Sequence, residues 1–205
     1  MRFSLYGELV TMVVREKETG AASSSRDGIP ARIVLAGFRA TGKSAVGGRL
    51  AARLQYRFID TDDELCARMK SSVAEFVRRR GWPAFRKMEQ ALLVELAGTE
   101  GVVIATGGGA ILHQDAWRAL RKGSLVVWLR AGAATIRQRL EADVASAVQR
   151  PSLTGIDPGR EIEEVLAARE PLYRLGSDVV IETEHRTPED IAAEIEQLCF
   201  CAPEG

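Results

Sequence analysis

The segment GFRATGKS, residues 37–44, contains the residue types whose spacing most clearly predicts chemistry. It fits the pattern G-x-x-x-x-G-K-[ST] of a phosphate-binding loop, and it follows an apolar run and precedes a helical pattern. Glycines let the backbone N–H groups of such a loop turn towards phosphate oxygens, and the start of the helix adds its dipole. We expect Lys43 to contact the β- and γ-phosphates of ATP and Ser44 to place its hydroxyl on Mg²⁺. The residues expected to bind ATP here are Gly37, Ala40, Thr41, Gly42, Lys43, Ser44 and Ala45.

Acids stand at the end of the second apolar run, in the sequence FIDTDDEL. In an extended segment Asp60 and Asp62 lie on the same side of the chain, around Thr61, because side chains alternate. One interpretation is that Asp62 or Asp63 only caps the helix that follows. An acid that ends an apolar strand beside a phosphate loop also suits a metal ion or its waters, which favours Asp60 as a metal residue. Asp62 could bind an acceptor hydroxyl and accept its proton.

Two further motifs each allow two interpretations. PAFRKMEQ sets Arg86 and Glu89 one helical turn apart, which by itself favours an exposed ion pair that contributes little. TGGGA, Thr106–Ala110, follows the third apolar run. Its successive glycines form either a tight turn or a place where the backbone must approach a ligand closely. Neither motif is decisive alone.

In their order along the chain, these motifs resemble shikimate kinase. The resemblance includes Arg150-Pro151, which is similar to that family's lid motif, and REPLYR, residues 169–174, which is similar to its R-x-P-L-Y signature. It covers roughly residues 33–198. The resemblance implies an α/β P-loop fold of the nucleoside-monophosphate-kinase type, with three layers and a five-stranded parallel sheet in the order 2-3-1-4-5. It also implies transfer of the γ-phosphoryl group of ATP to the 3-hydroxyl of shikimate in aromatic amino-acid (chorismate) biosynthesis, with Mg²⁺ as cofactor.

The same resemblance implies roles for single residues. Asp60 would hold the metal through water, and Asp62 would bind shikimate hydroxyls and act as the base. Arg86 and Arg169 would clamp the shikimate carboxylate, since each guanidinium offers two parallel donors. The expected catalytic residues are Lys43, Asp62 and Arg150; the substrate-binding residues are Asp62, Arg86, Gly107, Gly108, Gly109 and Arg169; and the metal residues are Ser44 and Asp60.

A mobile lid is expected at about residues 142–159, where the sequence has Pro and Gly and no clear period. By resemblance, Arg150 would move onto the phosphates of ATP when the lid closes, and Arg139 would lie along the adenine. The stretch between these arginines looks longer than usual for the family and contains Glu141 and Asp143. The lid therefore differs from the family pattern, as does Trp82-Pro83, where the family often has an acid.

The elements that must position these residues alternate along the chain, which is typical of a parallel sheet covered by helices on both faces. Such sheets bind ligands at the carboxyl ends of their strands. Residues 1–30 are expected to be a flexible extension, and residues 31–205 one domain. Strands are expected at residues 32–37, 56–60, 101–109, 125–129 and 178–183, and helices at 43–54, 63–69, 73–79, 84–96, at a segment ending at 140, at 161–174 and from 187 onwards.

Composition excludes several other classes of protein. Lys+Arg and Asp+Glu are both 28, so the chain lacks the basic excess of a nucleic-acid or membrane-surface binder. No apolar run approaches the ~18 residues of a membrane span, and no signal peptide is expected. Three cysteines suit a reducing compartment, and two histidines make a zinc site or a Ser-His-Asp site unfavoured. We expect a cytoplasmic monomer with shikimate and ATP as partners, and neither nucleic acid nor a membrane.

Two alternatives remain open. The first is another small-metabolite kinase of the same fold, of the gluconate-kinase type, which would need the phosphate loop but not the full motif set. The second is a kinase-like module that binds a ligand and regulates something without catalysis, an idea motivated by the unusual lid and by residues 1–30. Against it, the expected catalytic and binding residues are all present in the sequence.

Overall fold

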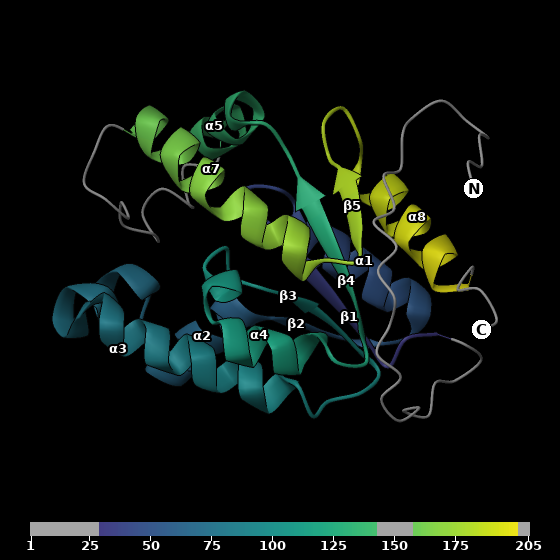
Figure 1. The fold of residues 1–205 in the computed structure, drawn as a ribbon, viewed down its shortest axis with the longest axis horizontal. Helices are drawn as coiled ribbons and strands as arrows, with labels where there is room; N and C mark the ends of the chain where they lie inside the picture. The colour runs from purple at the N-terminus through teal and green to yellow at the C-terminus, as the bar shows by residue number, and fades with distance from the viewer. Residues whose placement is uncertain (1–28, 143–157, 201–205) are drawn as a thin grey trace.

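Figure 1 shows the computed structural model of the chain, which describes residues 29–142 and 158–200. Five parallel strands form one sheet in the order β2-β3-β1-β4-β5, which confirms the predicted fold class and strand order. The strands are β1 (Arg32–Ala36), β2 (Arg57–Asp60), β3 (Val102–Ala105), β4 (Ser124–Arg130) and β5 (Val179–Glu182). The helices are α1 (Lys43–Leu54), α2 (Thr61–Met69), α3 (Val73–Leu96), α4 (Gln114–Arg121), α5 (Ala133–Ala142), α7 (Pro158–Gly176) and α8 (Pro188–Phe200), with a 3₁₀ turn, η2, at Ala110–Leu112.

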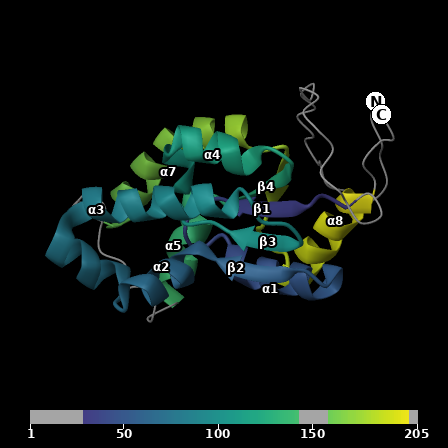
Figure 2. The ribbon, with the colours of Figure 1, turned by 90° about the horizontal axis from the view of Figure 1, so that it is seen from below.

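Helices cover both faces of the sheet (Figure 2). Side chains alternate along β1, so Ile33 and Leu35 pack with α1 and α8, whereas Val34 packs with the layer of α2, α3, α4 and α7. All three side chains are fully buried. A central strand buried on both faces reads as a continuous apolar run, which explains why RIVLA shows no alternation in the sequence.

Two helix boundaries differ from the sequence interpretation. Asp60, and not Asp62 or Asp63, caps α2, because its Oδ1 accepts a hydrogen bond of 2.9 Å from the backbone N–H of Asp62. The helix therefore begins at Thr61. The helices predicted at 73–79 and 84–96 are two halves of α3, which bends at Gly81 (φ 79°, ψ 162°).

Part of the predicted lid can be compared with the structure. Ala142 is the last residue of α5, and Pro158 and Gly159 are the first residues of α7, so these helices reach the two ends of the predicted lid segment. Its remaining residues, which include Arg150, lie outside the described residues, as does nearly all of the predicted extension. Within residues 29–142 and 158–200, no helix has the length and apolar character needed to cross a membrane.

Candidate active site

The predicted motifs meet because three neighbouring strands end at one edge of the sheet. β2, β3 and β1 are adjacent and parallel, and the phosphate loop, Asp60 and Thr106 follow or end β1, β2 and β3 respectively. Thr106 extends this arrangement, since its N–H and its hydroxyl both donate to the carbonyl oxygen of Leu35, each at 3.0 Å. The edge of a parallel sheet where ligands bind is therefore the edge where the motifs converge.

Side chains of the phosphate loop donate hydrogen bonds to the loop's own backbone carbonyls. Thr41 Oγ1 donates to the carbonyl of Phe38 at 2.8 Å, and Lys43 Nζ donates to the carbonyls of Gly37 and Phe38 at 2.9 and 2.7 Å. Gly37 has φ 139°, and a Cβ there would lie 2.4 Å from the carbonyl oxygen of Leu129 on β4. Only glycine fits this position, so β4 fixes where the loop begins.

Two oxygen-bearing side chains meet beside the loop. Ser44 Oγ, in the first turn of α1, donates to Asp60 Oδ2 at 2.5 Å. Hydroxyl and carboxylate oxygens are the ligands that Mg²⁺ uses, alone or through water. The pair therefore fits the predicted metal site, and Asp60 combines this position with its role as the cap of α2.

A first hollow is lined by residues 40–42 of the phosphate loop. Arg139 spans it, since Nη1 donates to the carbonyl of Ala40 at 3.1 Å and Nη2 to the carbonyl of Thr183 at 2.8 Å. Arg139 thus ties the phosphate loop to the segment after β5. The hollow is lined by Ala40, Thr41, Gly42, Val46, Arg139, Thr183, Arg186, Pro188 and Ile191.

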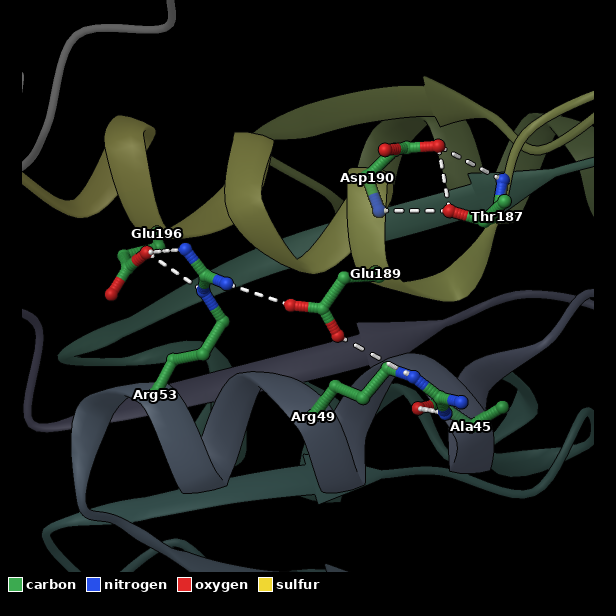
Figure 3. Close-up of polar contacts among 7 residues, drawn as sticks. All are labelled: Ala45, Arg49, Arg53, Thr187, Glu189, Asp190 and Glu196. Carbon is green, nitrogen blue, oxygen red and sulfur yellow. Dashed lines mark hydrogen bonds and ion pairs between the residues drawn. The ribbon is translucent and has the colours of Figure 1, made fainter.

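Ion pairs join α1 to α8, the helix that contributes Pro188 and Ile191 to this hollow (Figure 3). Glu189 pairs with Arg53 at 2.7 Å and with Arg49 at 3.6 Å. At the start of α8, Thr187 Oγ1 accepts from the N–H of Asp190 at 3.2 Å and donates to its carboxylate at 2.6 Å. The hydrogen bond from the Thr187 hydroxyl, and a second one from the Thr187 backbone N–H, lower the pKa of the Asp190 carboxyl group. The α8 N-terminus is therefore fixed relative to the helix that carries Lys43 and Ser44.

A second hollow is lined by Arg39 of the loop and by all of the predicted substrate-binding residues except Gly107. Asp62 comes from α2, Arg86 from α3 and Arg169 from α7, so three helices bring them together. The complete lining is Arg39, Asp62, Val73, Trp82, Phe85, Arg86, Glu89, Gly108, Gly109 and Arg169.

Arg86 and Glu89 form an ion pair in which Glu89 is buried and Arg86 is partly buried, which corrects the interpretation of an exposed pair. The Glu89 side chain is only 2% exposed, and its Oε2 accepts from Arg86 Nη1 at 2.5 Å. The guanidinium also lies over the rings of Trp82 and Phe85, at 5.2 and 5.7 Å from their centroids. Trp82, where the sequence departs from the family pattern, therefore helps to orient Arg86.

Burial alone would raise the pKa of Glu89. The hydrogen bond from His113 and the charge of Arg86 outweigh this effect, so the pKa lies below its ordinary value. Glu89 is thus an anion inside the protein, compensated by the groups around it.

Two of the three glycines, Gly107 and Gly109, lie very close to predicted substrate-binding side chains. A Cβ on Gly107 would lie 2.7 Å from Asp62 Oδ1, and a Cβ on Gly109 would lie 2.1 Å from Arg86 Nη1. The carbonyl of Gly108 accepts from Arg169 Nη1 at 2.9 Å and from the Tyr173 hydroxyl at 2.6 Å. The loop therefore packs directly on Asp62, Arg86 and Arg169, and it also forms a tight turn, since the N–H of Ala110 donates to the carbonyl of Gly107 at 3.0 Å.

Comparisons with known proteins agree with this geometry. A family model described as shikimate kinase matches residues 39–199. A shikimate kinase of Pseudomonas syringae pv. tomato is 41% identical over 163 residues, which are 80% of this chain and 92% of that protein. The chain belongs to the shikimate kinase family. A second shikimate kinase, of Oleidesulfovibrio alaskensis, is 46% identical over 143 residues, covering 70% of this chain and 83% of that protein. A solved shikimate kinase from Acinetobacter baumannii in complex with shikimate has a TM-score of 0.77 and 32% identity, over 84% of this chain and 93% of that one.

Several residues of this shikimate kinase family member were not assigned to the site from the sequence. Arg39 lines the acceptor hollow from within the phosphate loop, and its Nη2 contacts Glu161 of α7 at 3.3 Å. The sequence signal that could have identified Arg39 is that an arginine occupies one of the x positions of the G-x-x-x-x-G-K-[ST] pattern. Tyr173 is a buried core residue, and its hydroxyl also donates to the glycine loop. No local pattern pointed to His113, which contacts Glu89.

Proposed function

We propose that the protein is a shikimate kinase, a phosphotransferase that moves the γ-phosphoryl group of ATP to the 3-hydroxyl of shikimate. The observation that carries this proposal is that one loop separates two hollows. One hollow adjoins the start of a phosphate-binding helix, and the other holds a carboxylate and several guanidinium groups. Donor and acceptor would thus meet across residues 37–44, and the product would enter aromatic amino-acid biosynthesis.

The acceptor hollow matches the chemistry of a small polyol acid. The guanidinium groups of Arg86 and Arg169 would bind the carboxylate through paired donors. Asp62 would accept hydrogen bonds from the hydroxyls and take the proton of the hydroxyl that attacks. Gly107, Gly108 and Gly109 would let the substrate approach the backbone.

Phosphoryl transfer depends mainly on positioning and on cations around the transferred group. We propose that Lys43 exchanges the carbonyls of Gly37 and Phe38 for phosphate oxygens when ATP binds. Arg139 would lie along the adenine. Arg150, outside the described residues, would complete the set of cations when the lid closes.

Ser44 and Asp60 are the residues that would hold Mg²⁺, the first directly and the second through water. When bound, the ion neutralises negative charge on the phosphates of ATP. All proposed residues come from one chain, so a monomer would suffice for the reaction. Both substrates are dissolved molecules, which agrees with a protein of the cytoplasm.

The proposal is tested by ADP release from Mg·ATP, measured with shikimate, gluconate, a nucleoside monophosphate or no acceptor. We expect a strong rate with shikimate alone and its loss in Lys43→Ala. A preference for gluconate would favour the other kinase of this fold. Shikimate binding without any ADP release would favour the non-catalytic module.

A further inference from the structure

His113 occupies a position that the proposed reaction does not use. It follows the 3₁₀ turn after the glycine loop and stands at the start of α4. Its backbone is fixed on both sides, since its N–H donates to Ala110 at 3.1 Å and its carbonyl accepts from Trp117 at 2.7 Å. The side chain is only 11% exposed and reaches across to α3.

The imidazole contacts the same carboxylate oxygen as Arg86, the arginine predicted to bind the shikimate carboxylate. His113 Nε2 lies 2.8 Å from Glu89 Oε2, and Arg86 Nη1 lies 2.5 Å from that oxygen. Because an ionised carboxylate only accepts hydrogen bonds, Nε2 must carry the proton in this contact. Glu89 therefore accepts one hydrogen bond from His113 and one from the guanidinium of Arg86, which lines the acceptor hollow.

A buried carboxylate keeps its orientation only while donors surround it. If His113 could not donate, Glu89 Oε2 would keep its hydrogen bond from Arg86 but would lose the hydrogen bond from the residue at the start of α4. Arg86 would then follow Glu89 and lose its alignment with the hollow. The effect would be confined to binding of the phosphoryl acceptor, because the hollow beside Arg139 is lined by a different set of residues.

We propose that His113 is a positioning residue of the acceptor site: its Nε2–H holds Glu89 in the orientation in which Glu89 aligns Arg86 with the acceptor carboxylate. The identity of that acceptor rests on the proposed function. The inference concerns affinity for the acceptor and not the chemical step.

Three substitutions separate this role from simple packing. His113→Leu keeps the bulk but has no donor. His113→Gln places an amide N–H near the position of Nε2, whereas His113→Asn is shorter and ends near the position of Nδ1. A positioning role therefore predicts rescue by glutamine and not by asparagine. Arg118→Gln is a matched control, since Arg118 lies on α4 and its side chain is 78% exposed.

Steady-state kinetics and calorimetry of shikimate binding test the proposal on folded, full-length variants. Losing a hydrogen bond to a charged group weakens binding about tenfold. We expect His113→Leu and His113→Asn to raise the KM and the Kd for shikimate by about this factor, with the KM for ATP unchanged within about twofold. His113→Gln and Arg118→Gln should stay near wild type.

Equal changes for ATP and shikimate, or a leucine variant that binds shikimate like wild type, would overturn the proposal. Calorimetry keeps the two proposals separate. If the wild-type protein binds shikimate but does not phosphorylate it, the proposed function is wrong, and the His113 variants still decide the role of His113 through the Kd.

Discussion

Arg86 has its orientation set by contacts on several sides. Glu89 accepts from it, Trp82 and Phe85 lie under its guanidinium, and Gly109 leaves no room for a side chain beside it. Such contacts reduce the rotamer freedom that binding would otherwise remove. The specificity of the acceptor hollow therefore depends on how Arg86 is held as much as on its charge.

Replacing Arg86 tests the clamp directly. Arg86→Ala removes two charge-assisted donors, so we expect the Kd for shikimate to rise about 100-fold, while the Kd for ATP changes less than about threefold. Arg86→Lys keeps the charge but loses the planar fork and should lie in between. Calorimetry with each ligand measures both constants, with Arg118→Ala as the control. An equal loss for the two ligands would refute the clamp.

At the scale of the element, the sequence predicted what local patterns determine. Continuous apolar runs such as RIVLA identified the strands, and glycine with lysine at fixed spacing identified the loop before α1. What local patterns could not determine were contacts made by packing. Glu89 looked exposed because its surroundings come from α4 and the glycine loop, which lie far away in the sequence. Asp60 could not be recognised as the cap, because Asp62 and Asp63 have the same residue type.

The junction of β4 with the phosphate loop offers a test at this scale. Gly37→Ala would place a methyl group against the backbone of β4 at a φ that alanine avoids, so the loop must move. We expect a loss of stability of about 2 kcal/mol and at least a tenfold loss of kcat/KM for ATP.

Gly48→Ala is the matched control for this substitution. A Cβ on Gly48, in the middle of α1, meets nothing within 4 Å. Since alanine favours helices, this variant should gain about 0.5–1 kcal/mol and keep its activity. Thermal unfolding and kinetics of the two variants compare them directly. If Gly37→Ala were as stable and active as Gly48→Ala, the structural account of the loop would be wrong.

On the scale of the whole molecule, the phosphate loop is the shared wall of two hollows. Arg39 faces the acceptor hollow, whereas the adjacent Ala40 and Thr41 line the other. Each hollow is completed by elements distant in sequence, α2, α3 and α7 for one and α5 and α8 for the other. The fold thus places two hollows a few residues apart without using the same side chains for both.

Alkaline unfolding tests the core that supports the glycine loop. Burial raises the pKa of Tyr173 to about 12 from 10.0, so the folded protein holds this proton more tightly than the unfolded chain. The protonated Tyr173 hydroxyl contributes fully to the free energy of unfolding below pH 10, and this contribution is lost as the pH rises towards 12. Between about pH 9 and about pH 11, wild type should lose about 1 kcal/mol more stability than Tyr173→Phe. Urea unfolding at both pH values measures this difference. Equal losses of stability in wild type and Tyr173→Phe would contradict the raised pKa of Tyr173.

The central claim is that this protein attaches the γ-phosphoryl group of ATP to the 3-hydroxyl of shikimate. The most direct measurement is ³¹P–¹H correlation NMR of shikimate incubated with Mg·ATP and the full-length protein. We expect one new phosphate monoester whose phosphorus couples to the proton on C3, and no such product with Lys43→Ala. Phosphate on another carbon, or free inorganic phosphate as the only new phosphorus signal besides ADP, would contradict it.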